Sequence, residues 1–152
     1  MRGLLLASAL LLAATASCSD GDNRLYGSAS EVLDLAFDET EVSLVGNYLV
    51  IEYLRGPETR RVKVIKLSLD MTAMQVVPGE KIDLSSRVGQ ASRGTLQRIV
   101  EGTVDLPLER GTLVLDNVPA HGKPLSGHFR TILAEPAGRT LNGDFSAQVA
   151  AP

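Results

Sequence analysis

Along most of the chain, short apolar runs are separated by turn residues at the intervals typical of β-strands. Residues 47–54 (NYLVIEYL) and 62–69 (VKVIKLSL) are rich in β-branched and aromatic side chains, and Gly56 and Pro57 lie between them. Such runs joined by turn residues predict an antiparallel hairpin. Further strands are predicted at residues 81–84, in the stretch 98–108, and around Leu113 and Leu115.

Residues 31–38 (EVLDLAFD) carry apolar side chains at every second position, which predicts a strand. A helix is the alternative, because Ser28 and Glu31 have the spacing of a capping box at a helix start. The strand is favoured, since no helical periodicity continues beyond Asp38.

The clearest pattern lies near the C-terminus, where Leu125-Ser-Gly-His-Phe129 recurs as Leu141-Asn-Gly-Asp-Phe145. Between the two copies, Pro136-Ala137-Gly138 suits a three-residue hairpin loop, because proline fits the first turn position and glycine the left-handed one. The register predicted from this loop pairs Leu133 with Leu141, Thr131 with Gly143, Phe129 with Phe145, Gly127 with Ala147, and Leu125 with Val149. It sorts apolar and small side chains to one face and polar ones, including an Arg130–Asp144 pair, to the other.

About eight short strands with frequent turns and no convincing helix predict an all-β fold, either an antiparallel β-sandwich or a small barrel. The chain of 152 residues is long enough to bury a core without disulfides. We divide it into a signal peptide (1–17), a polar tether (18–27) and a β domain (28–152).

The N-terminus has the three parts of an export signal. Met1-Arg2 is a short basic start, residues 3–14 (GLLLASALLLAA) are almost wholly apolar, and small residues follow. The apolar run is too short to cross a bilayer, which takes roughly 20 residues. The pattern predicts a cleaved signal peptide and an exported protein.

Two cleavage sites remain open at the end of this leader. Ala14-Thr15-Ala16 is an A-x-A site, and cleavage there would leave Ser17 first. Alternatively, Ala16-Ser17-Cys18 resembles the lipobox of bacterial prolipoproteins, although Thr15 stands where that family usually has Leu. The resemblance implies that Cys18 is lipid-modified and becomes the first residue.

The lipid interpretation of Cys18 is favoured because this is the only cysteine in the chain and it stands where a lipobox needs one. A free thiol would be a liability in an oxidising compartment. Residues 19–24 (SDGDNR) are small and polar, as a tether would be. The resemblance also indicates the outer membrane, because Asp directly after the cysteine retains such proteins at the inner membrane and this chain has Ser19.

Composition narrows the range of functions. A formal net charge of -3 does not fit a nucleic-acid binder, and a single cysteine excludes a site with several thiolates. Six aromatic rings, three Phe and three Tyr, are too few for a sugar-stacking platform. The common hydrolase, nucleotide and zinc motifs are absent from the sequence, so no cofactor and no catalysis are expected.

The remaining candidate residues have weak signals. His121 and His128 have no particular metal spacing. The acidic residues Glu31, Asp34, Asp38, Glu39 and Glu41 form a cluster that could bind a cation, although a solvated strand edge is the preferred interpretation. Residues 85–95 (SSRVGQASRGT) form the longest irregular segment, and its Arg87 and Arg93 are candidates for contact with an anionic glycan, lipid headgroup or protein.

Together these features predict a membrane-anchored envelope lipoprotein that acts as a structural or interaction module. Its expected partners are the membrane, through Cys18, and an envelope protein or glycan. The alternative is a periplasmic or surface carrier that encloses a small apolar ligand within its sheets.

Overall fold

The computed structural model of the chain describes residues 23–152, which form twelve strands and two short 3-10 helices. The strands are β1 (Arg24–Tyr26), β2 (Glu39–Val45), β3 (Tyr48–Arg55), β4 (Val62–Asp70), β5 (Lys81–Asp83), β6 (Arg87–Val88), β7 (Ala91–Ser92), β8 (Gly94–Ile99), β9 (Thr103–Asp105), β10 (Leu108–Leu115), β11 (Pro124–Leu133) and β12 (Thr140–Gln148). The 3-10 helices are η1 (Ser28–Glu31) and η2 (Glu58–Arg60). The expected signal peptide and Cys18 lie outside the described residues.

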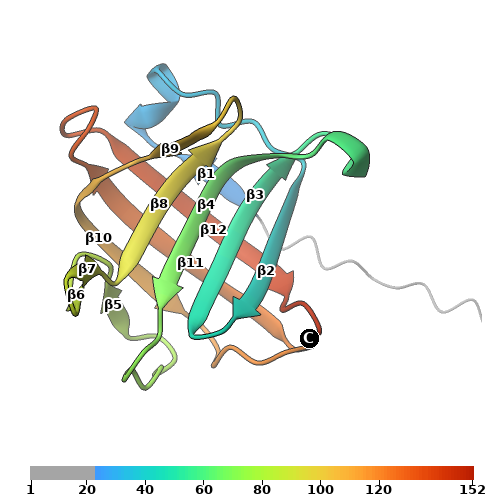
Figure 1. The fold of residues 1–152 in the computed structure, drawn as a ribbon, viewed down its shortest axis with the longest axis vertical. Helices are drawn as coiled ribbons and strands as arrows, with labels where there is room; N and C mark the ends of the chain where they lie inside the picture. Colours follow the sequence, from blue (N-terminus) through green and yellow to red (C-terminus); the bar gives the residue numbers. More distant parts are fainter. Residues whose placement is uncertain (1–22) are drawn as a thin grey trace, which may run out of the picture.

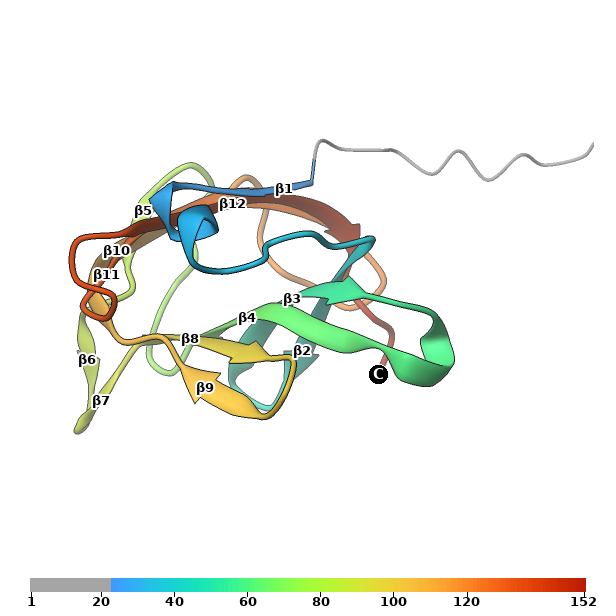
Figure 2. The same cartoon turned by 90° about the horizontal axis from the view of Figure 1, so that it is seen from above.

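Ten of these strands build two antiparallel sheets of five strands each. The first sheet has the order β1-β12-β11-β10-β5, and the second has the order β2-β3-β4-β8-β9. Figure 2 shows the sheets as two stacked layers, and in Figure 1 the strands of one layer cross those of the other. The sheets are not closed into a barrel, so the fold is a β-sandwich, one of the two predicted architectures.

A hydrophobic core fills the space between the sheets. Alternate side chains of β4 (Ile65, Leu67 and Leu69) point inward and are fully buried, as a half-buried strand requires. Tyr53 of β3 is also fully buried, and its hydroxyl donates a hydrogen bond to the main-chain oxygen of Asp144 in the first sheet at 3.0 Å. The hydroxyl is the only polar group of the Tyr53 side chain, and burying it without a hydrogen-bond partner would cost free energy. The Asp144 oxygen supplies that partner.

The C-terminal hairpin is confirmed as β11 and β12, but the predicted register is wrong by two residues. Thr131 pairs with Leu141, not with Gly143, and Phe129 pairs with Gly143, not with Phe145. The reason is a longer loop. The Leu133 amide donates to the Arg139 oxygen at 2.8 Å, so this closing pair encloses five residues, where the predicted loop had three.

Because the error is an even number of residues, every side chain of this hairpin keeps its predicted face. Phe129 and Phe145 point into the core, and Gly138 has the predicted left-handed conformation with φ of 73°. The expected ion pair between Arg130 and Asp144 also forms, at 2.9 Å, although the two residues are diagonal neighbours.

The predicted strand at 31–38 is wrong. Ser28–Glu31 is the 3-10 helix η1, and the residues after it run irregularly to β2. Local bonds replace a strand ladder, because an Asp34 carboxylate oxygen accepts from the Ala36 amide at 3.1 Å. The alternation nevertheless reflects burial: Leu35 is 8% exposed, and Leu33 and Phe37 pack against the core. Apolar alternation here marks a loop that covers the core.

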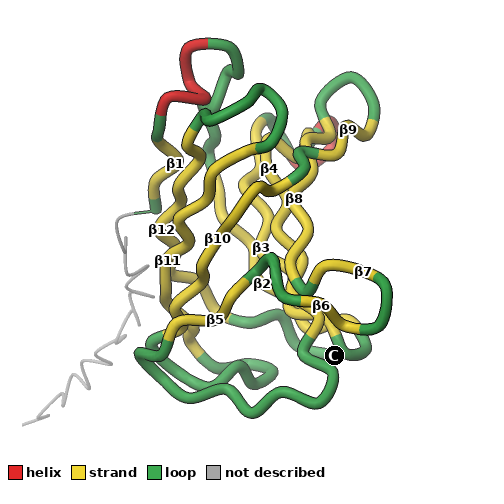
Figure 3. The backbone as a smooth tube through the Cα atoms, turned by 90° about the vertical axis from the view of Figure 1, so that its left-hand side faces the viewer, coloured by secondary structure: helices red, strands yellow, loops and turns green. Residues whose placement is uncertain are grey.

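The segments 85–95 and 98–108 both differ from their predictions, because each contains a hairpin turn where an irregular segment and a single strand were expected (Figure 3). The first contains the two-residue strands β6 and β7, which form a small hairpin at the side of the sandwich (Figure 1). The second contains the turn between β8 and β9, so the expected stretch is a hairpin. These short pairs account for most of the strands beyond the eight expected.

The sequence prediction placed the end of the polar tether at residue 27, but the ordered sheet begins earlier. Arg24–Tyr26 form β1, which pairs with Asn142–Asp144 of β12 at the edge of the first sheet. Before β1, two hydrogen bonds join Asn23 to Ser146. The Ser146 amide donates to the Asn23 side-chain oxygen at 2.6 Å, and the Asn23 NH₂ group donates to the Ser146 main-chain oxygen at 3.3 Å. The β domain therefore includes residues 23–27.

Candidate functional site

The outer face of the first sheet carries a row of polar side chains drawn from all five strands. Strand pairing places Tyr26, Asn142, Arg130, Thr112 and Asp83 side by side in this order. They share one face because successive side chains of a strand point to opposite faces, and Thr112, Arg130 and Asn142 each stand between two buried neighbours. Residues separated by more than one hundred positions in the chain thus meet on one surface.

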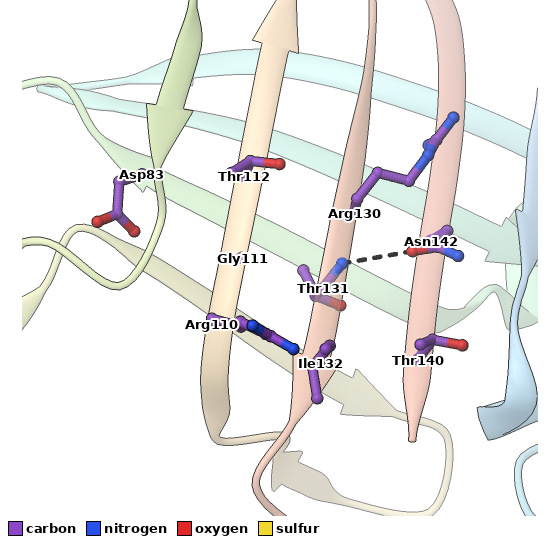
Figure 4. Close-up of a pocket in the computed structure, with 9 residues that line it drawn as sticks. All are labelled: Asp83, Arg110, Gly111, Thr112, Arg130, Thr131, Ile132, Thr140 and Asn142. Carbon is purple, nitrogen blue, oxygen red and sulfur yellow. Dashed lines mark hydrogen bonds between the residues drawn. The ribbon is translucent and has the colours of Figure 1, made fainter. Parts of the chain in front are cut away.

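This row crosses an open pocket of about 470 Å³, which we call the outer pocket (Figure 4). Its side chains come from β5, β10, β11 and β12 and include Asp83, Arg110, Thr112, Arg130, Ile132 and Asn142. The volume falls within the range of about 300–1,000 Å³ that is usual for small-molecule sites. The outer pocket is our candidate functional site.

Arg130 is held in place at one side of the outer pocket. One guanidinium nitrogen donates to the main-chain oxygens of Phe129 at 2.8 Å and Gly143 at 3.3 Å, and another lies 2.9 Å from Asp144. The guanidinium carbon is 5.2 Å from the centre of the Tyr26 ring, within the range of a cation–π contact. These contacts leave Arg130 little freedom and fix a cation beside the pocket.

Arg110 lies across the pocket from this cluster and is exposed. It follows a β-bulge in β10, where the register with β11 shifts between Leu108 and Arg110. A bulge re-aims the side chains next to it, and in Figure 4 the guanidinium extends from β10 towards Ile132. No hydrogen bond or ion pair within residues 23–152 engages it, so its donors face solvent.

The other polar groups of the pocket offer both donors and acceptors. One Asp83 carboxylate oxygen accepts from the Ser85 amide at 2.8 Å, and the other oxygen of this exposed side chain has no hydrogen-bond partner among residues 23–152. The Asn142 side-chain oxygen accepts from the Thr131 amide at 3.4 Å, which leaves its NH₂ group available. The Thr112 hydroxyl lies between them (Figure 4).

The interior of the sandwich offers a different environment for a ligand, and bulky side chains occupy its centre. A Cβ atom added to Gly143 would lie less than 3.0 Å from both the Phe129 ring and the Tyr53 hydroxyl. The two rings meet edge to face, with their centres 6.3 Å apart. The space that a carried apolar molecule would need at this point is therefore filled by side chains.

Of the two arginines predicted as a binding loop, Arg93 has a clear structural contact. Its guanidinium donates to the main-chain oxygens of Asp70 at 2.8 Å and Thr72 at 3.4 Å, which ties the loop after β4 to the start of β8. Arg87 is exposed and donates to the Gln90 oxygen within its own hairpin at 2.5 Å. The two side chains belong to separate local networks.

The two histidines do not meet. His128 lies on the outer face of β11, opposite Asp144, and His121 lies in the loop before β11 with its Nδ1 2.9 Å from the Ala150 oxygen. Within residues 23–152, no three His, Cys, Asp or Glu side chains are grouped so that they could hold a metal ion.

The predicted acidic cluster is interleaved with arginines. Asp34 forms an ion pair with Arg55, and Glu31 forms one with Arg139 at 2.6 Å. Arg61 contacts both Glu39 and Glu41 at 2.5 Å. A carboxylate oxygen of Asp38 accepts from the Gly56 amide at 2.8 Å. The hydrogen bond from Arg55, supported by that from the Ala36 amide, lowers the pKa of the Asp34 carboxyl. The cluster therefore forms a network of surface ion pairs.

Sequence reasoning missed most of the outer pocket. The C-terminal hairpin pattern placed Arg130 on the polar face, but it did not bring Arg110 or Asp83 beside it. Only the pairing of β10 with β11 and β5 does so. One sequence feature could have indicated it. Arg110 and Thr112 alternate with inward-facing residues in the run that ends at Leu115, so both belong on the outer face of the sheet.

The lipidation residue Cys18 lies outside the described residues, so its surroundings form no part of this site. Among residues 23–152 there is no helix of the length and apolar character needed to cross a membrane. Comparisons of the chain with protein-family models, with curated proteins and with solved structures gave no match.

Proposed function

We propose that the chain is an exported, lipid-anchored protein of the bacterial cell envelope, and that its β-sandwich is a non-catalytic interaction module. The observation that carries the proposal is the position of Cys18, the sole cysteine, at the small-residue end of an export signal. Lipid chains on this residue would attach the protein to a membrane, because each buried methylene contributes about 0.8 kcal/mol and several chains give stable anchoring. The outer membrane is the favoured location.

The start of the ordered domain supports an anchored arrangement. Five residues separate Cys18 from Arg24, the first residue of β1. Whatever their conformation, five residues span at most about 18 Å. A domain anchored at Cys18 would therefore stay close to the membrane surface, within reach of other envelope components.

The outer pocket supports the role of an interaction module. It is open, it combines fixed and free polar groups, and it lies on a sheet face that no other described element covers (Figure 2). An envelope protein or a glycan is the class of partner that we propose for it.

The decisive experiment is mass spectrometry of the N-terminal peptide from the membrane fraction of cells that produce the full chain. We expect a peptide that begins at Cys18 and carries the added mass of lipid. Cys18→Ala is the matched control and should move the protein to the soluble fraction. An unmodified peptide that begins at Ser17 would overturn the proposed anchor, since it would show cleavage after Ala16.

A further inference from the structure

We infer that the outer pocket binds an acidic saccharide, a sugar ring that carries a carboxylate, and that Arg110 holds the carboxylate. The inference deepens the proposed role of the sandwich as an interaction module. It does not depend on the lipid at Cys18, so the two can fail separately.

Arg110 provides the anion-binding group. Its guanidinium is exposed, lies over the pocket and has no carboxylate partner among residues 23–152. Five of the nine other arginines among residues 23–152 are paired with a carboxylate, namely Arg24, Arg55, Arg61, Arg130 and Arg139. A guanidinium fork matches a carboxylate in shape and can donate two parallel hydrogen bonds to it.

The charge balance on the opposite side of the pocket favours the same ligand. Asp144 is shared by two arginines, with Arg24 at 3.1 Å and Arg130 at 2.9 Å. One carboxylate cannot neutralise two guanidinium groups, so this trio keeps a net positive charge. Arg110 and the trio outweigh the Asp83 carboxylate of the lining by one charge, so the area around the pocket keeps a net charge of +1 and attracts an anion.

The polar groups of the lining fit hydroxyl groups, with Thr112 and Asn142 inside the sheet and Asp83 at its β5 edge (Figure 4). The free Asp83 oxygen accepts hydrogen bonds, the Asn142 NH₂ donates them, and the Thr112 hydroxyl does both. Three strand spacings, about 14 Å, separate Asp83 from Asn142, so a disaccharide, and not a single sugar ring, can reach all three groups. Inorganic phosphate is too small to reach from Arg110 to these groups at the same time.

Ile132 completes the fit. This half-buried apolar side chain lies opposite Arg110 in the strand pairing, between the polar residues of β10 and β12 (Figure 4). The C–H face of a sugar ring is apolar and can pack on it. Together the free cation, the hydroxyl-binding groups and this apolar floor match an acidic sugar better than a neutral sugar or a bare anion.

The test is calorimetric titration of the purified full-length protein in detergent with a disaccharide that contains glucuronic acid. Two comparison ligands are the neutral disaccharide of the same linkage, with hydroxymethyl in place of the carboxylate, and inorganic phosphate. We expect the neutral disaccharide to bind at least tenfold more weakly than the acidic one. We expect phosphate at the same concentration not to displace the acidic disaccharide.

Three variants locate the site. Arg110→Gln should weaken binding of the acidic disaccharide at least tenfold, and Thr112→Leu, which fills the pocket, should abolish it. Lys66→Gln is the matched control, because Lys66 is an outward cation of the second sheet, opposite Glu52. It should change the Kd less than twofold. A thermal melt of each variant confirms that it is folded.

The inference is overturned if the acidic disaccharide does not bind, if Arg110→Gln binds it as tightly as the unmodified protein, or if the neutral disaccharide binds equally well. A further arm presents the same acidic sugar as the headgroup of a glycolipid in vesicles, which separates a membrane-borne source from a free glycan. The mass of the N-terminal peptide is measured on the same preparation. Saccharide binding with an unmodified Cys18 would refute the anchor alone, and a lipidated protein without binding would refute the pocket alone.

Discussion

Phe129 of β11 lies directly opposite Gly143 of β12, and its ring occupies the space that a side chain at 143 would need. The second copy of the repeat makes the same contact in reverse, because Gly127 lies opposite Phe145 and an added Cβ would lie 2.9 Å from that ring. Each phenylalanine thus covers a glycine on the neighbouring strand. The two Leu-x-Gly-x-Phe segments are complementary in this antiparallel pairing.

The first prediction is that Gly143→Ala lowers the free energy of unfolding by about 1–3 kcal/mol, the usual cost of overpacking a core. The new methyl group would overlap the ring of Phe129 and the hydroxyl of Tyr53. Urea denaturation gives the change, and Ser146→Ala on the outward face of the same strand is the control. If the two variants are equally stable, the close packing at Gly143 is wrong.

Phe129→Leu tests the partner of that contact. A smaller side chain leaves room for the methyl group, so the double variant with Gly143→Ala should cost less than the sum of the two single changes. We expect a coupling free energy of about 1 kcal/mol between residues in direct contact. Strict additivity would show that the ring and the glycine do not share this space.

Tyr53→Phe should lower the free energy of unfolding at pH 7 by about 1 kcal/mol, because it removes the hydrogen bond to the Asp144 oxygen and leaves that acceptor without this donor. Its ring contacts with Phe37 and Phe129 are kept in the variant. Denaturant titration at pH 7 gives the change, with Tyr48→Phe at an exposed position as the control. Equal stability of both variants would contradict the role of this bond.

The same residue predicts a pH dependence. Burial raises the pKa of Tyr53 well above its ordinary value of 10.0. Above pH 10 the unfolded chain therefore loses this proton while the folded protein keeps it, and stability falls as the pH rises. The stability advantage of the unmodified protein over Tyr53→Phe should shrink by up to about 1.4 kcal/mol per pH unit above 10. An advantage that stays constant between pH 9 and 11 would show that the phenol is not buried.

The fold could be predicted from the sequence wherever apolar alternation coincides with strand pairing. The hairpins β3–β4 and β11–β12 meet this condition, and both were predicted. The same alternation at Leu33, Leu35 and Phe37 belongs to a loop, because a loop that covers the core also needs every second side chain inward. The alternation of apolar residues shows which side chains are buried. Whether the segment is a strand depends on a neighbouring segment with which its main chain can form hydrogen bonds.

The register of the last hairpin shows a second limit. Pro136 and Gly138 marked the turn correctly, but loop length is decided by hydrogen bonds such as that between the Leu133 amide and the Arg139 oxygen. The outer pocket was even harder to predict from the sequence. Arg110, Arg130 and Asp83 lie on three strands, and no local pattern states which strands are neighbours.

Arg93 and Arg87 should differ in their effect on stability. Arg93→Ala removes hydrogen bonds to the carbonyls of Asp70 and Thr72, and we expect it to cost about 1 kcal/mol. Arg87→Ala affects only a contact within an exposed hairpin, and it should change stability by less than about 0.5 kcal/mol. Chemical denaturation of both variants checks this difference. Equal effects would mean that Arg93 does not fasten the loop.

The last prediction concerns Arg61, which separates like charges at the edge of the second sheet. It contacts Glu39 and Glu41 at 2.5 Å, and Glu41 is also paired across the strands with Glu52. Without Arg61, neighbouring carboxylates would repel one another. Because the pairs are partly exposed, Arg61→Gln should lower the free energy of unfolding by only about 0.5–1 kcal/mol at low ionic strength.

Salt distinguishes this electrostatic effect from lost packing. At 1 M salt the screening length is about 3 Å, so the destabilisation by Arg61→Gln should largely disappear. Denaturation of the unmodified protein and the variant at low and high salt measures the change. Lys63→Gln, which removes the partner of Glu52 at 2.6 Å, should show the same salt dependence. A destabilisation that persists in high salt would indicate that the hydrocarbon part of Arg61, and not its charge, supports the sheet edge.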